Sequence, residues 1–256
     1  MYDVSTRKRA LALVAQGRSL NAVSKETGIS RAAIRSWQTR TEPRRRGHSC
    51  VRCRDRPSPP ENPASYAYLL GLYLGDGCIS AGRRGVYAMR IVCDNTWPGV
   101  IDACEEALRD VHPHNSVCRV KKQGCVAVTS SSKHWPCLFP QHGPGKKHDR
   151  RIALEPWQTE IVDSHPWEFV RGLIHSDGCR ITNWTTRLVA GRPKRYEYPR
   201  YFFTNKSDDI RGLYTGILDK LGVVWTHCTR HGNPYNISVA RRADVALMDT
   251  HVGPKH

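Results

Sequence analysis

Two aspartates occupy matching positions in two similar stretches of the chain and could together hold a cation. Asp76 ends the stretch 69–76, and Asp177 ends the stretch 170–177, 101 residues later. Two carboxylates brought side by side repel each other, and one takes up a proton unless a cation lies between them. Oxygen ligands of this kind suit Mg²⁺, which can activate water and stabilise the leaving oxygen of a phosphodiester. The pair therefore predicts metal-assisted chemistry on a phosphate.

The stretches that must position these aspartates have the periodicity of helices. Positions i, i+3, i+4 and i+7 of one buried helix face are filled in the first stretch by Leu69, Leu72, Tyr73 and Asp76. The two aspartates are followed by Gly77 and Gly178. We expect each of these glycines to end its helix in the left-handed conformation.

Small residues four positions apart mark another face of both helices. Such a face lets two backbones pack unusually close, and this contact must offset the cost of each helical glycine, up to ~1 kcal/mol relative to alanine. Paired about a pseudo-twofold axis, the helices would carry both aspartates to adjacent C-terminal ends, where unpaired carbonyls also favour a cation. The small residues are Gly71, Gly75, Gly172 and Ser176.

Both stretches resemble the signature motif of the LAGLIDADG homing endonucleases, with Asp76 and Asp177 at its catalytic acidic position. The resemblance covers roughly residues 65–256 and implies an α+β fold, in which two pseudo-symmetric αββαββα units form a DNA-binding saddle. It also implies that Mg²⁺ is bound by the two carboxylates and by the carbonyls of Gly75 and Ser176. An Asp-Gly pair after a helix is more often only a cap, but its spaced duplication favours the family.

Composition limits the partners of the chain. A formal charge of +17 and a pI near 9.7 indicate a polyanionic partner. The longest apolar stretch, 67–75, is too short to span a bilayer, and the charged N-terminus lacks the apolar core of a secretory signal. We therefore expect ten reduced cysteines and a cytoplasmic location, associated with the nucleoid if the source is bacterial.

Residues 1–40 predict a small all-α domain of the helix-turn-helix kind. A helix over 5–15 precedes a short helix, a tight turn at 27–29, and an N-cap at Ser30 for a last helix that buries Ile34 and Trp37. In such a domain the N-terminal residues of the last helix meet DNA, so the candidate contacts are Ser30, Arg31 and Arg35. A structural three-helix bundle for protein contacts is the alternative.

Residues 41–64 predict a basic, proline-rich linker. Residues 1–64 hold +9 of the net charge, with arginines at 44–46, which suits a nonspecific DNA anchor. Cys50 and Cys53 have zinc-ligand spacing, but a structural zinc needs four ligands and no second close pair follows them in the sequence. We therefore favour a flexible arm with two idle thiols over a Zn²⁺ site.

The remaining chain divides into two repeats, 65–160 and 161–256. The first contains hairpins over 78–95 and 116–130, a helix over 97–111 and a short closing helix, and a basic surface loop at 140–151 joins the halves. The second has strands 180–186 and 198–205 joined by a long basic turn, then helix 208–221, two strands and a final helix. The charged candidates for DNA contact are Arg83, Arg84, Arg90, Lys121, Lys122, Arg187, Lys194, Arg195, Arg200, Arg241 and Arg242.

Two asparagines near the ends of the second strands, Asn95 and Asn205, lie where the family places polar residues that position water. Together these features predict a monomeric, Mg²⁺-dependent endonuclease that cuts double-stranded DNA at a specific site, as in intron or intein mobility. Two alternatives stay open. One is a helix-turn-helix transcriptional regulator with a catalytically silent LAGLIDADG domain, and the other is an intron RNA maturase.

Overall fold

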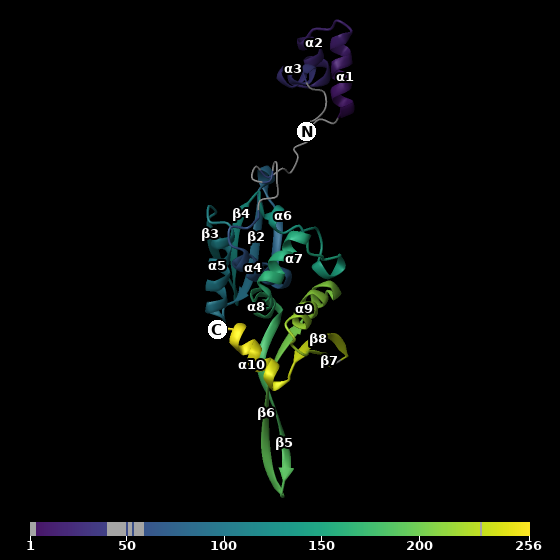
Figure 1. The fold of residues 1–256 in the computed structure, drawn as a ribbon. Coiled ribbons are helices and arrows are strands. Elements are labelled where there is room, and N and C mark those ends of the chain that lie inside the picture. The colour runs from purple at the N-terminus through teal and green to yellow at the C-terminus, as the bar shows by residue number, and fades with distance from the viewer. Residues whose placement is uncertain (1–3, 40–49, 51–52, 54–58, 231) are drawn as a thin grey trace. The chain divides into compact units, whose positions relative to one another are not determined.

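The chain divides into two compact units, Met1–Ser49 and Cys50–His256. The computed structural model (Figure 1) describes residues 4–39, 50, 53, 59–230 and 232–256. Most of the expected linker, including the arginines at 44–46, lies outside the described residues. Among the described helices, none is long and apolar enough to cross a membrane.

The first unit contains three short helices, α1 (Val4–Ala15), α2 (Leu20–Thr27) and α3 (Arg31–Thr39). They enclose a small core formed by Ala10, Val23, Ile29, Ile34 and Trp37. Gly28 ends α2 with a φ of 69°, which glycine adopts at no steric cost. Ser30 then accepts a hydrogen bond from the Ala33 amide at 3.3 Å, as expected of an N-cap. The order and bounds of these helices follow the sequence closely, and their function as a helix-turn-helix stays a prediction.

The second unit repeats one arrangement twice. Its first half comprises α4 (Pro63–Asp76), β1 (Gly77–Ala81), β2 (Tyr87–Asp94), α5 (Pro98–Val111), β3 (Val117–Lys122), β4 (Cys125–Ser132) and α6 (Trp135–Leu138). After α7 (Pro156–Ser164), the second half comprises α8 (Pro166–Asp177), β5 (Gly178–Val189), β6 (Arg192–Thr204), α9 (Asp208–Lys220), β7 (Thr226–Arg230), β8 (Asn233–Val239) and α10 (Arg242–His251). The sheets are antiparallel, in the orders β1-β2-β4-β3 and β5-β6-β8-β7. The expected α+β fold with two αββαββα units is confirmed.

The long turn expected between β5 and β6 is wrong. The two strands pair continuously out to Val189 and Arg192, because Ala190 and Gly191 close the hairpin with φ values of 51° and 75°. Two consecutive residues with positive φ form the kind of tight turn that follows the natural twist of a hairpin. Since β6 pairs with β8 only over Tyr201–Thr204, residues 181–200 form a two-stranded extension, which we call the β5–β6 ribbon (Figure 1).

Helices α4 and α8 pack with their backbones in contact at the small residues. A Cβ added to Gly172 would lie 2.1 Å from the Tyr68 carbonyl oxygen, and one added to Gly71 would lie 2.5 Å from the Phe169 carbonyl oxygen. At the next turn, a Cβ on Gly75 would lie 2.2 Å from Ser176 Oγ. No side chain fits at these glycines, so the duplicated small residues fix how closely the two helices approach.

The expectation that Gly77 and Gly178 adopt the left-handed conformation is wrong. Their φ values are −90° and −109°, in extended backbone. Glycine is needed there for space instead, because a Cβ on Gly77 would lie 2.5 Å from Tyr73 Cα, and one on Gly178 would lie 2.7 Å from Ile174 Cα. Each motif helix therefore turns directly into the first strand of its sheet.

Candidate active site

The close packing of α4 and α8 brings the two aspartates to one place. The Asp177 carboxyl carbon lies only 3.1 Å from where a Cβ of Gly75 would be, next to Asp76. Partial burial and the neighbouring charge of Asp177 raise the pKa of Asp76 to about 6. Burial also raises the pKa of Asp177, and a hydrogen bond from Asn205 opposes this rise. The site therefore concentrates negative charge that favours either protons or cations.

Two lysines lie at the helix ends beside the aspartates. Lys147 Nζ donates hydrogen bonds to the carbonyl oxygens of Gly75 and Gly77, both at 2.8 Å, and to that of Tyr73. Lys255 Nζ donates to the carbonyl oxygen of Ser176 at 2.9 Å. Burial lowers the pKa of Lys147 to about 8, although both aspartates act to raise it. Neither lysine is among the site residues predicted from the sequence.

The loop that carries Lys147 differs from its expected form. It contains a short 3₁₀ turn at Lys147–Asp149, and Lys147 is half-buried against the end of α4 rather than free on a surface. Together with Asp177, Asn205 and Tyr235, this loop lines a cavity of about 550 Å³. The one sequence signal for this arrangement is the pair of glycines, Gly143 and Gly145, just before Lys147. This signal does not indicate which element the lysine packs against.

Asn205 and Asn95 are not equivalent in the structure. The side-chain amide of Asn205 donates a hydrogen bond to Asp177 Oδ2 at 2.5 Å, whereas Asn95 is exposed. The hairpin registers explain the difference, because Gly178 pairs with Phe203 and Gly77 pairs with Ile91.

Asn205 lies two positions after Phe203 in β6. The residue two positions after Ile91 in β2 is Cys93, which is buried. A hydrogen bond with Cys104 lowers the pKa of the Cys93 thiol, while burial and the charge of Asp76 raise it. The structural counterpart of Asn205 beside Asp76 is therefore Cys93. Asn95 therefore does not occupy the strand position equivalent to that of Asn205, and its expected part in positioning water stays a prediction.

The oxygen atoms at this site fit a hard divalent cation. Two carboxylates and the carbonyl oxygens of Gly75 and Ser176 gather at the two helix ends, and both carbonyls already accept hydrogen bonds from ammonium groups. Positive charge is thus favourable where the resemblance implies Mg²⁺ ligands. The chain offers the donor atoms that such an ion requires.

The predicted DNA-contact residues occupy several surfaces. In the second unit, they lie in the 3₁₀ turn between β1 and β2, in β2, at the end of β3, on the β5–β6 ribbon, and at the N-cap and first residue of α10. Arg90 is half-buried and donates to Ser80 Oγ at 2.5 Å, and Arg200 is half-buried over the Phe202 ring. The exposed members are Ser30, Arg31, Arg35, Arg83, Arg84, Lys121, Lys122, Arg187, Lys194, Arg195, Arg241 and Arg242.

Cys50 and Cys53 are not isolated thiols. Both lie in the second unit, and their sulfur atoms are 3.3 and 3.4 Å from His134 Nδ1. His134 and Cys137 have the same spacing as the cysteine pair, but they lie more than 80 residues later, so no signal close to Cys50 and Cys53 in the sequence pointed to them. Both thiols thus lie against a polar side chain in the second unit, whereas the sequence predicted two thiols without a partner.

The chain resembles known proteins at the level of three-dimensional structure and not at the level of sequence families. No protein-family model matches it, and no curated protein matches it. Solved structures do match. I-DmoI in complex with DNA and Mn is 15% identical with a TM-score of 0.45, over 76% of this chain and 98% of that one.

Two further solved structures are similar at the same level. I-WcaI bound to its DNA recognition sequence is 12% identical with a TM-score of 0.47, over 75% of this chain and 82% of that one. The N-terminal LAGLIDADG domain of DUF199/WhiA is 11% identical with a TM-score of 0.46, over 75% and 83%. The structural neighbours of this chain are thus LAGLIDADG homing endonucleases and the LAGLIDADG domain of a WhiA protein.

Proposed function

We propose that this chain is a site-specific endonuclease that hydrolyses phosphodiester bonds of double-stranded DNA with Mg²⁺. One observation carries the proposal: two helices packed backbone against backbone deliver Asp76 and Asp177 to one place, where the pKa of each carboxyl is raised. Crowding two carboxylates costs stability. An arrangement that maintains this cost is expected where the carboxylates hold a cation for chemistry.

The ligand set follows from the atoms at the two helix ends. Asp76, Asp177 and the carbonyl oxygens of Gly75 and Ser176 would hold Mg²⁺, which supplies activated water and stabilises the leaving oxygen. Asn205 orients the carboxylate of Asp177. Lys147 and Lys255 add positive charge beside the helix ends, where it attracts the phosphate of the bound strand.

Duplex DNA is the substrate that the surface supports best. The chain has a net charge of +17, and the β5–β6 ribbon carries Arg187, Lys194 and Arg195 on exposed positions. The major groove of DNA admits a two-stranded ribbon of this kind. In the first unit, α3 offers Ser30, Arg31 and Arg35 on its exposed face, as a recognition helix would. Because both motif helices come from one chain, the active species would be a monomer.

The test uses the full chain and a binding site recovered from random DNA by repeated selection of bound fragments. Asp76→Asn and Asp177→Asn are each expected to abolish cleavage of a plasmid that carries the site, because an amide cannot supply the charge that holds Mg²⁺ against its hydration shell. DNA binding in Ca²⁺ should persist in both variants. Asp163→Asn, which removes an exposed carboxylate paired with Lys220, is the matched control and should cut normally.

A wild-type chain that binds its selected site but never nicks it in Mg²⁺ or Mn²⁺ would contradict the proposed nuclease activity.

One observation favours a second candidate, a DNA-binding regulator without catalysis. Lys147 and Lys255 already place two positive charges beside the two carboxylates, so the site can be neutral without a metal ion. In that case both Asp→Asn variants would bind DNA like wild type, and Mg²⁺ would not change the thermal stability of the wild-type chain.

A further inference from the structure

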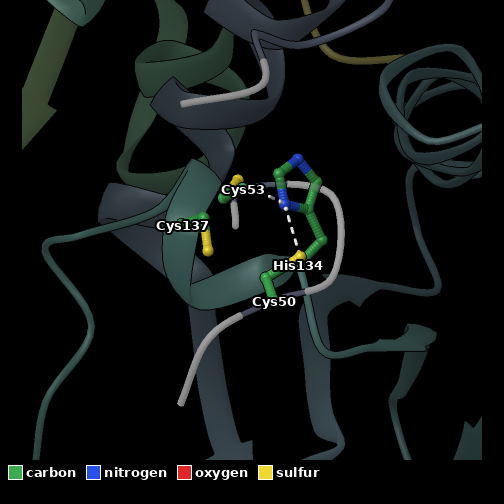
Figure 2. A group of neighbouring side chains, drawn as sticks. All are labelled: Cys50, Cys53, His134 and Cys137. Atoms are coloured by element: carbon green, nitrogen blue, oxygen red, sulfur yellow. Dashed lines mark hydrogen bonds between the residues drawn. The ribbon is translucent and has the colours of Figure 1, made fainter. Parts of the chain in front are cut away.

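Four potential metal ligands from two distant parts of the chain meet in the second unit. Cys50 and Cys53 precede α4, whereas His134 and Cys137 lie at α6, more than 80 residues later in the sequence. Their sulfur and nitrogen atoms all lie within 4.8 Å of one another. Figure 2 shows the His134 ring with its Nδ1 edge turned toward the cysteine sulfurs. No function described above uses these side chains.

The two halves of this cluster are built in the same way. Each half is a pair of ligands three positions apart within a single turn. The Cys53 amide donates to the Cys50 carbonyl oxygen at 3.1 Å, and the Cys137 amide donates to the His134 carbonyl oxygen at 2.9 Å. Such a turn sends side chains i and i+3 to the same side. Two of these turns facing each other supply four ligands around one point.

The distances match a tetrahedral zinc site. With Zn–S bonds of about 2.3 Å and Zn–N bonds of about 2.0 Å, tetrahedral ligand atoms lie about 3.5–3.8 Å apart. The separations from His134 Nδ1 to the Cys50 and Cys53 sulfurs, 3.3 and 3.4 Å, fall just below this range. The other pairs of ligand atoms lie within 4.8 Å of one another, so shifts of up to about 1 Å would bring all four to tetrahedral distances.

The chemistry of the ligands narrows the choice of ion. Three thiols and one imidazole are soft and borderline ligands, which select Zn²⁺ over the Mg²⁺ that suits Asp76 and Asp177. None of the three cysteines in the cluster forms a disulfide, so their sulfur atoms can bind a metal ion. Cys50 and His134 are only 4% and 3% exposed. Four protein ligands in a largely buried place leave no open coordination position, as in structural rather than catalytic zinc sites.

The cluster also lies far from the aspartates along α4. Tyr66, in the first turn of α4, donates a hydrogen bond to the Leu138 carbonyl oxygen of α6 at 2.5 Å, whereas Asp76 ends α4. A helix of 14 residues is roughly 20 Å long at 1.5 Å per residue. Metal at the cluster would thus act on structure at the opposite end of the motif helix.

We propose that Cys50, Cys53, His134 and Cys137 form a structural Zn²⁺ site that fastens the segment entering the second unit onto α6. The ion closes a loop of more than 80 residues, and it fixes the chain ahead of α4 next to the sheet of the first half. This anchoring supports the N-terminal end of the same helix whose C-terminal end carries Asp76. The proposed zinc site does not depend on whether the chain cleaves DNA.

The first measurement is metal content of the full-length protein, purified without chelators. One Zn²⁺ per chain is expected by mass spectrometry of the metals, and Cys53→Ser and Cys137→Ser should each lose it. Cys78→Ser and Cys118→Ser, which alter exposed cysteines elsewhere in the second unit, are matched controls and should retain it. Asp76→Asn should also retain it, which separates this site from the Mg²⁺ site.

A second measurement covers the case in which the cysteine variants fail to fold. Wild-type protein reconstituted with Co²⁺ should show the intense visible bands of tetrahedral cobalt with thiolate ligands, and Zn²⁺ should bleach them. Absence of those bands in folded wild-type protein, or Zn²⁺ retained by both ligand variants, would overturn the site. Iron in place of zinc in protein from zinc-supplemented cells, or a Cys50–Cys53 disulfide in freshly purified protein, would overturn it too.

Discussion

The side-chain amide of Asn205 donates a hydrogen bond to Asp177 Oδ2 at 2.5 Å. Asp76 has no such asparagine at the matching strand position, because the hairpin register places Cys93 there. The hydrogen bond opposes the rise that burial causes in the pKa of Asp177, while burial and Asp177 raise the pKa of Asp76 to about 6. The two halves of the site are therefore chemically unequal.

Replacing Asn205 should expose this inequality as a difference between the two DNA strands. Asn205→Ala removes the hydrogen bond that lowers the pKa of Asp177, so the carboxylate charge forms at higher pH. We expect the pH–rate profile for cleavage of one of the two strands to shift to higher pH. Nicked plasmid should therefore accumulate near neutral pH. Asn95→Ala, at an exposed position, is the control. Equal effects of the two substitutions would contradict the asymmetry.

The contact between α4 and α8 predicts that alanine at Gly172 lowers the stability of the fold strongly. In Gly172→Ala the new methyl group would collide with the Tyr68 carbonyl oxygen, which lies 2.1 Å from the Cβ position. Backbone cannot move aside as a side chain can, so the free energy of unfolding should fall by about 3 kcal/mol, at the upper end of what overpacking costs.

Gly212→Ala in α9 is the matched control, since no atom lies within 4 Å of its Cβ position. It should raise the free energy of unfolding by roughly 0.5–1 kcal/mol through helix propensity alone. Chemical denaturation of both variants measures the two changes. Similar stability of Gly172→Ala and wild type would mean that the helices do not pack at this distance.

His175 should make the second unit sensitive to acid. This residue is 7% exposed and lies 2.9 Å from the Tyr68 hydroxyl on the facing helix. Burial lowers the pKa of His175 from 6.5 to about 4, with a further contribution from Arg171. A depressed folded-state pKa gives stability that is complete above pH 6.5 and is lost as the pH falls toward 4. The expected loss is on the order of 3 kcal/mol at about 1.4 kcal/mol per pKa unit.

His175→Gln should remove this part of the pH dependence. Asp76 acts in the opposite direction over part of the same range, because its raised pKa favours the folded state at low pH. The informative quantity is therefore the difference between variant and wild type at each pH, in which the Asp76 contribution cancels. His114→Gln changes an exposed histidine and should leave the curve unchanged. A variant curve parallel to wild type from pH 7 to 4 would argue against the buried neutral imidazole.

The β5–β6 ribbon should account for part of the salt dependence of DNA binding. Each phosphate neutralised by a cation contributes about 0.9 to the slope of log K against log salt. Changing Arg187, Lys194 and Arg195 together to Gln should therefore lower the slope by about 2–3. The control removes the same charge from exposed positions elsewhere, Arg109, Lys133 and Lys220. Equal slopes for the two triple variants would place the DNA away from the ribbon.

The features that the sequence could predict are those repeated or encoded locally. The duplicated motif identifies both aspartates, and its small residues at positions 71, 75, 172 and 176 indicate the close helix contact. Hydrophobic periodicity and turn residues place most strands and helices within a few residues of their bounds. These signals suffice because each depends on neighbours in the sequence.

The remaining features depend on contacts between distant residues. Lys147 reaches the end of α4 from a loop about 70 residues later, and Cys50 meets His134 across 84 residues. The counterpart of Asn205 is decided by strand register, which a similar sequence position cannot reveal. The ribbon was missed because its basic and polar composition resembles a loop, while the turn at 190–191 lets both strands continue.

The open strand edges of the β5–β6 ribbon can promote association between molecules of this protein. β5 is an edge strand throughout, β6 becomes a second edge beyond β8, and Trp184 and Leu188 are 61% and 76% exposed. Unpaired edges of this kind can join the edges of other molecules unless charge or proline prevents it.

Here the protection comes from Pro193, Pro199 and the lysine and arginine side chains between them. Concentrated salt screens charge repulsion. A high-salt buffer that prevents this basic chain from binding nucleic acid would therefore also weaken the charge repulsion that opposes self-association. We expect light scattering of the DNA-free protein to rise with salt at fixed concentration and to fall again when duplex covers the ribbon. Scattering that stays constant across this range would show that proline alone keeps the edges apart.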